Sequence, residues 1–329
     1  MRLVSSLRAI AHGPLVSAIL RRIYAGRGTI LMLHRIVPRE EFSTLQLNQN
    51  LELAPADLDA VIRWACSKRY RLVSLGQFCV NVRARQGRRM FCLTFDDGYV
   101  DTLTHALPVL EMHSAPATIF VITDMPDLRF KLWSYAFEQI LREDPNRDQK
   151  FLALTGSILA NSRLKNDELF RKFGLTDNLF RHLCARYSLT WGDIRRLAQH
   201  PLITIGAHTV SHPVLSSLSD AQLETELLES KHRLETETQR EVTLFAYPFG
   251  IAGPRECEAA RRAGFEAAVT NRTGNVVDGH KDHLWALPRH WAGYPHFSVS
   301  ALESQMSGYS HFRRGQFRPM VTANRPLCS

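Results

Sequence analysis

Two adjacent carboxylates, Asp96 and Asp97, stand where a short apolar run ends in a glycine. The run, Met90 to Phe95, is typical of a buried strand, and the Asp-Asp-Gly sequence marks the end of that strand. Neighbouring carboxylates repel each other, so a fold keeps them together for a cation, a strong hydrogen-bond partner or catalysis. A solvated turn, in which Asp-Gly supplies only turn geometry, is the structural alternative.

Two histidines, His208 and His212, follow a second strand-like run, Leu202 to Ile205. At a spacing of four residues they share one face of a helical turn, so both imidazoles can reach one ion. A third run, Val242 to Ala246, ends in Tyr247-Pro248-Phe249-Gly250. One carboxylate and two imidazoles that end neighbouring strands favour a zinc site with open positions for water.

These motifs resemble those of the polysaccharide deacetylases of the NodB-homology, or carbohydrate esterase 4, family. The TFDDG motif of that family matches Thr94–Gly98, and its H-[ST]-x-x-H motif matches His208–His212. Its R-x-P-[YF] motif is matched by Ala246–Phe249, with alanine in place of arginine. The similarity extends from about Thr29 to Ala292. It implies a distorted (β/α) barrel of seven strands with its site at the carboxyl ends of the strands.

The order of the remaining patterns agrees with an α/β fold of this kind. Helical and strand-like segments alternate through most of the chain, which favours a parallel sheet that is closed or nearly so. Between about residues 124 and 190 charged helical segments replace the alternation, and we interpret them as a helical insertion at the barrel mouth. The expected divisions are a basic amphipathic N-terminal arm (1–28), a deacetylase barrel (29–305) and a basic C-terminal tail (306–329).

The resemblance also implies roles for single residues. Asp96 would act as the general base, and the backbone N–H of Phe249 would stabilise the oxyanion. The metal would be a divalent ion, most simply zinc, with cobalt or nickel as alternatives. Its implied ligands are Asp97, His208 and His212. The residues expected to contact the substrate are Tyr247, Pro248 and Trp291.

Two further roles come from less complete matches. In permuted relatives, similar to those that trim poly-N-acetylglucosamine, an L-x-H motif near the N-terminus bears the general acid. Met32-Leu33-His34 resembles that motif, which makes His34 the expected acid, and His290 is the alternative if His34 is structural. Arg289, which follows the last strand we expect, would orient Asp96 in place of the arginine missing at Ala246.

Composition and charge place further bounds on the protein. With 45% hydrophobic and 22% charged residues, the chain is typical of an ordinary globular protein. Its six scattered cysteines contain no C-x-x-C pair, which favours a reducing compartment over a disulfide framework. The net charge of +9 comes without an aromatic-interleaved basic motif, so we expect no nucleic-acid partner.

The N-terminal arm is basic, since residues 1–38 contain six arginines and no acid precedes Glu40. No apolar stretch there is long enough to span a bilayer, and arginine or histidine interrupts every candidate secretory core. We therefore expect a cytoplasmic protein. Three interpretations of the arm stay open: contact with an anionic membrane surface at the inner face, packing on the barrel, or an organellar transit peptide.

The functional hypothesis is a metal-dependent hydrolase that removes N-acetyl groups from the amino sugars of a polysaccharide, oligosaccharide or glycolipid. Without an export signal it resembles the cytoplasmic chitooligosaccharide deacetylases. Two alternatives stay open: hydrolysis of a non-sugar amide on the same barrel, and a catalytically silent glycan-binding protein. The charge of the insertion speaks against the first, and retention of Asp96 and both histidines speaks against the second.

Overall fold

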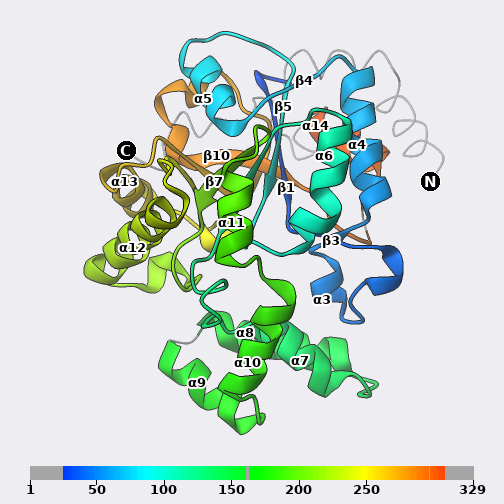
Figure 1. Ribbon diagram of the computed structural model, residues 1–329, viewed down its shortest axis with the longest axis vertical. Helices are drawn as coiled ribbons and strands as arrows, with labels where there is room; N and C mark the ends of the chain where they lie inside the picture. The colour runs from blue at the N-terminus through cyan, green and yellow to red at the C-terminus, as the bar shows by residue number, and fades with distance from the viewer. Residues whose placement is uncertain (1–24, 161–162, 296, 308–329) are drawn as a thin grey trace, which may run out of the picture.

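The structure is a computed structural model that describes residues 25–160, 163–295 and 297–307 (Figure 1). At its centre, parallel strands form a ring in which each strand is hydrogen-bonded to two neighbours. In spatial order these seven strands are β1 (Gly28–Leu33), β10 (Leu287–Trp291), β9 (Ala267–Thr273), β8 (Leu244–Ala246), β7 (Ile203–Ala207), β6 (Ala117–Val121) and β5 (Met90–Phe95). Pairing of β5 with β1 closes the ring. The predicted (β/α) barrel is therefore confirmed.

Helices surround the ring because their apolar residues recur on one face. In α4 (Pro55–Ser67), the buried residues Leu58, Val61, Ile62 and Ala65 follow this helical spacing. The other helices around the barrel are α5 (Leu75–Arg83), α6 (Leu107–Met112), α11 (Trp191–Ala198), α12 (Asp220–Thr238), α13 (Pro254–Arg262) and α14 (Val299–Met306). Outside the ring, β4 (Arg71–Leu72) pairs with the start of β5, and β2 (Arg35–Ile36) pairs with β3 (Glu52–Leu53).

Strand β10 corrects the sequence analysis. We expected Leu287–Trp291 to follow the last strand, but this segment is itself a strand, inserted between β9 and β1. Its polar residues hide it from an apolar pattern, and Pro288 disfavours a strand interior. The register with β9 shifts between Leu287 and Arg289, which accommodates the proline. With this shift β10, which carries Arg289, still pairs with both β9 and β1.

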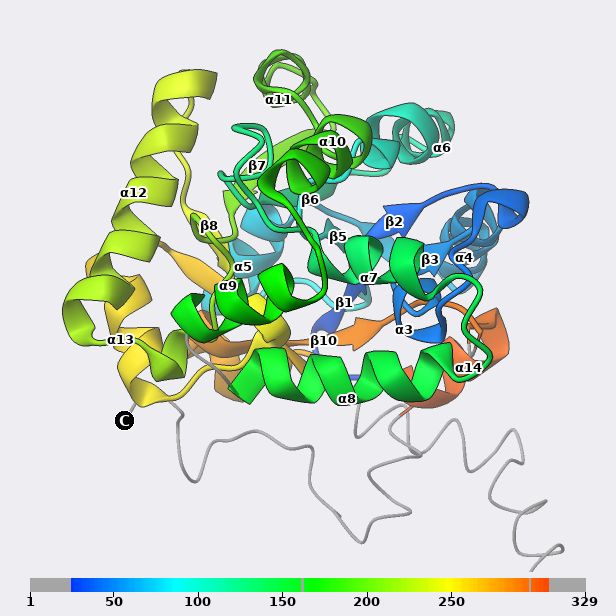
Figure 2. The ribbon, with the colours of Figure 1, turned by 90° about the horizontal axis from the view of Figure 1, so that it is seen from below.

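Between β6 and α11 the chain forms a cap of four helices: α7 (Trp133–Leu141), α8 (Arg147–Ala160), α9 (Arg163–Lys172) and α10 (Asp177–Tyr187). The cap lies at one end of the barrel in Figure 1, and Figure 2, viewed from that end, shows its helices across the strand ends. It has an apolar cluster of its own, which includes Phe137, Phe151 and Phe180. Because β6 leads into the cap, the cap stands at the carboxyl end of the strands.

Parts of the expected division lie beyond what the structure describes. Residues 1–24 of the basic arm and 308–329 of the basic tail are outside the described residues. Among the helices that are described, none combines the length and apolar character needed to cross a bilayer.

Candidate active site

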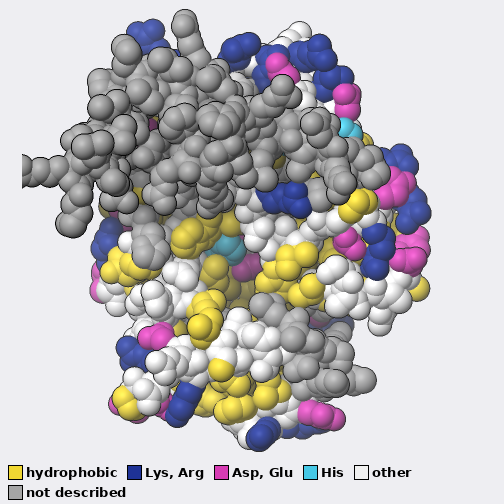
Figure 3. All heavy atoms as spheres, turned by 180° about the vertical axis from the view of Figure 1, so that it is seen from behind, with side chains coloured by type: hydrophobic (Ala, Val, Ile, Leu, Met, Phe, Trp, Pro, Cys, Tyr) yellow, Lys and Arg dark blue, Asp and Glu magenta, His cyan; other side chains and the backbone are white. Residues whose placement is uncertain are grey.

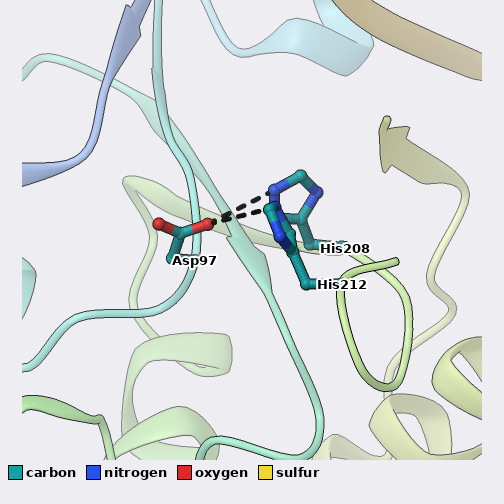
Figure 4. Close-up of side chains that lie close together, drawn as sticks. All are labelled: Asp97, His208 and His212. Carbon is teal, nitrogen blue, oxygen red and sulfur yellow. Dashed lines mark ion pairs between the residues drawn. The ribbon is translucent and has the colours of Figure 1, made fainter. Parts of the chain in front are cut away.

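Three side chains that suit a divalent metal converge at the carboxyl ends of β5 and β7. The Nε2 atom of His208 lies 3.4 Å from Oδ1 of Asp97, and the Nε2 atom of His212 lies 3.8 Å from the same oxygen (Figure 4). One potential ligand atom from each residue falls within 4.8 Å of the others. Two imidazoles and one carboxylate leave coordination positions open for water and substrate.

The two histidines meet by a different route from the predicted helical turn. Residues 208–212 form an irregular loop, and both Thr209 and His212 have left-handed backbone conformations, with φ of 68° and 55°. The Thr209 hydroxyl accepts a hydrogen bond of 3.0 Å from the His212 N–H, which tightens the reversal. The expectation of a helix was therefore wrong, although the spacing of four residues does bring both rings to one point.

Glu226 of α12 holds this histidine loop from outside. Its carboxylate accepts hydrogen bonds from the N–H groups of Val210 (2.8 Å) and Ser211 (2.9 Å), and from the Ser211 hydroxyl (2.5 Å). Sequence reasoning missed Glu226, because it is one of several acids on a long charged helix and nothing in the pattern distinguishes it. The carboxylate fixes the backbone between the two histidines.

The orientation of His208 and the neutral state of His212 suit metal binding. Nδ1 of His208 lies 2.7 Å from the Ala246 carbonyl oxygen, so Nδ1 carries a proton and Nε2 is the ring nitrogen that faces Asp97. Burial and the nearby His208 lower the pKa of His212 to about 3, which keeps that imidazole neutral. Burial alone would lower the pKa of His208, but its hydrogen bond with Asp97 and the charge of Asp96 raise it.

Asp96 is held by a buried arginine. Nη1 and Nη2 of Arg289 each donate a 2.7 Å hydrogen bond to one oxygen of Asp96, and the two residues are only 1% and 3% exposed. The same guanidinium donates to the Thr94 hydroxyl (3.0 Å) and the Thr270 carbonyl (2.9 Å). Burial would raise the pKa of Asp96, but the charge and hydrogen bonds of Arg289 lower it. The structure thus places an ionised carboxylate beside the three metal-binding side chains.

The two candidate acids lie in different surroundings. His34 directly follows β1, and the Asp96 N–H donates to the carbonyl of the preceding Leu33 (2.9 Å), so His34 comes next to Asp96. His290 is adjacent to Arg289 in a strand, where successive side chains point to opposite faces. Its Nε2 lies 3.1 Å from Oδ1 of Asn275, and its side chain is fully buried. The geometry brings His34, and not His290, to the carboxylates.

The segment after β8 carries two aromatic rings, one half-buried and one fully buried. Phe249 has a left-handed φ of 57°, and its half-buried ring packs on His212 at a centroid distance of 4.6 Å. Tyr247 is fully buried and donates from its hydroxyl to the Trp285 carbonyl (2.8 Å). Pro248 is buried as well. Tyr247 and Pro248 thus belong to the interior beside the site, and their contact with a substrate stays a prediction.

Trp291, the third expected substrate contact, is half-buried at the end of β10. Trp291 lies two residues beyond Arg289 along the strand, so the two side chains are on the same face of β10.

Histidine and acidic side chains are visible in a recess bordered by hydrophobic side chains (Figure 3). Phe130 contributes a second ring against His212, at 6.2 Å. The rings of Phe130 and Phe249 thus both pack against His212.

Comparison with known proteins gives a consistent result. A family model described as polysaccharide deacetylase matches residues 83–268. Among curated proteins, the chain is 20% identical over 235 residues to YxkH of Bacillus subtilis (strain 168), whose name places it among the polysaccharide deacetylases. That match covers 71% of this chain but only 63% of the relative, less than two thirds of its length.

Solved structures share the fold. A Streptococcus pyogenes deacetylase, PplD, in complex with acetate matches with a TM-score of 0.59 at 21% identity, over 84% of this chain and 97% of that one. IcaB from Ammonifex degensii matches with a TM-score of 0.58 at 16% identity, over 86% and 98% of the two chains. At these identities the likeness shows the architecture of the barrel.

Replacing Glu226 by glutamine should weaken metal binding without unfolding the barrel. The amide can accept fewer of the three hydrogen bonds, and loss of such an outer support typically costs about 10- to 100-fold in metal affinity. Calorimetric titration of the metal-free protein with zinc or cobalt measures the metal affinity. The matched control is Glu229→Gln, an exposed residue of the same helix. Equal affinities in the two variants would contradict the supporting role of Glu226.

Proposed function

Because the chain belongs to the polysaccharide deacetylase family, we propose that it is a metal-dependent hydrolase that removes N-acetyl groups from amino sugars. The substrate would be a polysaccharide, an oligosaccharide or a glycolipid. The observation that carries the proposal is the pairing of a three-residue metal site with a buried, ionised Asp96 directly beside it. That combination suits attack by water on an acetamide carbonyl.

The metal ligands in this proposal are Asp97, His208 and His212. Their donor set of two nitrogens and one oxygen fits zinc, and also cobalt or nickel. When bound, such an ion polarises a carbonyl oxygen and lowers the pKa of its bound water. Neutral His212 would offer a lone pair to it, and the Ala246 carbonyl fixes His208 with Nε2 toward the same point, where the ion would take the place of a proton.

Asp96 would take the proton from the attacking water. A carboxylate offers about four lone-pair sites, and the two hydrogen bonds from Arg289 leave others free to accept. The planar guanidinium fixes the orientation of the carboxylate. Arg289 is thus a positioning residue, and it supplies from β10 what Ala246 cannot supply from β8.

Two groups serve the later steps. Within the described residues the N–H of Phe249 donates to no backbone carbonyl, and the left-handed conformation of the residue suits an oxyanion donor at the site. His34 would give a proton to the departing amine, since an unprotonated amide nitrogen is a very poor leaving group. Trp291, on the face of β10 that carries Arg289, is positioned to contact the sugar.

The hydrophobic border of the recess favours one second candidate, hydrolysis of a non-sugar amide. The chemistry at the metal and at Asp96 would be the same. An apolar acyl or amine group would then fill the space that a sugar ring occupies in the first proposal.

Acetate release from N-acetylglucosamine oligomers, with zinc or cobalt present, tests the main proposal. We expect release by the wild type, a loss of about 100-fold or more in Asp96→Asn, and inactivation by a chelator that added metal reverses. If metal binds but no N-acetylated glycan or glycolipid releases acetate, the deacetylase proposal fails. Release of acetate from apolar N-acetyl amides alone would favour the second candidate.

Arg289→Ala should lower turnover by about 100-fold while metal stays bound, because Asp96 loses its orientation but the three ligands remain. Arg289→Lys keeps the charge but loses the planar pair of N–H donors that bonds both oxygens of Asp96, so we expect an intermediate rate. Arg261→Ala, an exposed arginine of α13, is the control. Circular dichroism checks folding, since removal of one partner of a buried pair is destabilising. Unchanged turnover in a folded Arg289→Ala protein would contradict the role.

We also propose that the protein works at the cytoplasmic face of a membrane, bound through its basic end. The arm joins the barrel at Gly28, which pairs with Met90 at the start of β5. Exposed arginines gather in the neighbouring loops: Arg69, Arg71, Arg83, Arg85, Arg88 and Arg89. Arg83 and Arg89 donate to backbone carbonyl oxygens, those of Glu266 and Lys68, which carry no net charge. Anionic headgroups attract such a surface.

Co-sedimentation of the full chain with vesicles tests this contact. We expect binding to vesicles with anionic lipid, weak binding to neutral vesicles, and loss of binding as salt increases. Each basic residue near the surface contributes about 1 kcal/mol, so Arg85→Glu with Arg88→Glu should weaken binding by 10-fold or more. The control is Arg171→Glu with Lys172→Glu on α9, in the cap. Equal weakening by both pairs would contradict a specific basic face.

A further inference from the structure

Arg35, the residue after His34, is a buried cation at the junction of barrel and cap. Its Nε donates to Oδ2 of Asp101 at 2.8 Å, and its Nη1 donates to Glu52 and to the Tyr135 hydroxyl, both at 3.3 Å. Only 8% of its side chain is exposed. Arg35 therefore belongs to the interior of the protein and not to a basic surface.

Three tyrosine rings surround the same guanidinium. Its central carbon lies 5.4 Å from the ring of Tyr99, 5.3 Å from that of Tyr135 and 4.8 Å from that of Tyr187. Tyr135 belongs to α7 and Tyr187 ends α10, so two helices of the cap reach Arg35. The carbonyl of Tyr187 also accepts from the Val100 N–H at 2.8 Å. The cap is thus tied to both segments that follow β1 and β5.

The position of His34 is set by the anchored backbone beside it and not by a hydrogen bond to Nδ1 of its ring. A catalytic histidine is usually oriented by a partner on its second ring nitrogen. Within the described residues, Nδ1 of His34 is buried and has no hydrogen-bond partner. The chain just after it is anchored instead: the Arg35 N–H donates to the Leu51 carbonyl (2.9 Å), and the Ile36 N–H donates to Asp101 (2.7 Å).

Stability alone gives a poor account of this cluster. Burying one cation with two carboxylates costs desolvation that their attraction barely offsets, and apolar replacements of buried ion networks are often neutral or stabilising. Burial raises the pKa of Glu52 to about 7, against the opposing charge of Arg35, and it also raises the pKa of Asp101. Two carboxylates whose charged forms are disfavoured by burial, yet which both bond to one arginine, suggest that a defined geometry matters at this junction.

We propose that Arg35 and Tyr135 are positioning residues through which the helical cap holds His34 in place for proton transfer to the leaving amine. The inference rests on the proposed function, in which His34 is the acid. It gives the cap a role in the reaction: the helices α7 and α10, through their contacts with Arg35, set the position of the neighbouring His34.

The test compares two substrates in three variants. An N-acetylglucosamine oligomer needs a proton on its leaving amine, whereas 4-nitrophenyl acetate releases a stable phenolate and needs none. Arg35→Lys should lose about 10- to 100-fold in kcat on the oligomer, as expected for a misplaced catalytic group. Tyr135→Phe should lose several-fold, and both should lose little on the ester. Tyr187→Phe, which keeps its ring on the guanidinium, is the matched control.

His34→Gln supplies the pattern to be matched: a large loss on the oligomer and a small one on the ester. Equal losses on both substrates in Arg35→Lys would mean a general structural role and would overturn the inference. The imidazole signals of ¹⁵N-labelled protein give a readout without activity, with His34→Gln assigning the His34 signal. We expect Arg35→Lys and Tyr135→Phe to shift that signal and Tyr187→Phe to leave it unchanged.

The signal of His34 also separates the two proposals. A wild type that releases no acetate from any glycan would end the deacetylase proposal, while a shifted His34 signal in the variants would still support the link between cap and His34. An unmoved signal in a folded Arg35→Lys protein would overturn that link, whatever the substrate proves to be.

Discussion

The carboxylates of Asp96 and Asp97 lie side by side at the end of β5, and their repulsion must be balanced for the site to exist. The two are balanced differently. Asp96 receives the fixed charge of Arg289 through two hydrogen bonds, whereas Asp97 faces two imidazoles at 3.4 and 3.8 Å. The two carboxylates therefore differ in chemistry. The charge of Asp96 is compensated by an arginine of the protein, whereas Asp97 stays available to a metal ion.

The pair of Asp96 and Arg289 also constrains the barrel. Arg289 reaches Asp96 because β10 lies in the ring, between β9 and β1. The guanidinium then bonds to Thr94 and Thr270 as well, which joins β5, β9 and β10 at their carboxyl ends. With that charge supplied from β10, position 246 is free to be alanine, and its carbonyl orients His208.

The sequence predicted most of this architecture, because apolar strands that end in polar motifs are visible in the chain. It also predicted that Arg289 could stand in for the arginine missing at Ala246, and the structure brings Arg289 and Asp96 into contact. The sequence did not predict features that depend on contacts between distant segments or on backbone conformation. The segment of β10 carries Pro288, Arg289 and His290, so no apolar period marks it as a strand. The loop of His208 needs left-handed residues at Thr209 and His212, which side-chain type does not indicate.

Burial is the second property that the sequence pattern did not reveal. Tyr247 is aromatic and adjoins the site in sequence, yet its hydroxyl is used by the Trp285 carbonyl in the core. Arg35 was counted with a basic arm, yet it lies among three tyrosines and two carboxylates. A cation that deep needs partners from every side, and the cap supplies Tyr135 and Tyr187. The insertion is therefore built into the junction beside His34, and a change in its helices must alter the surroundings of that histidine.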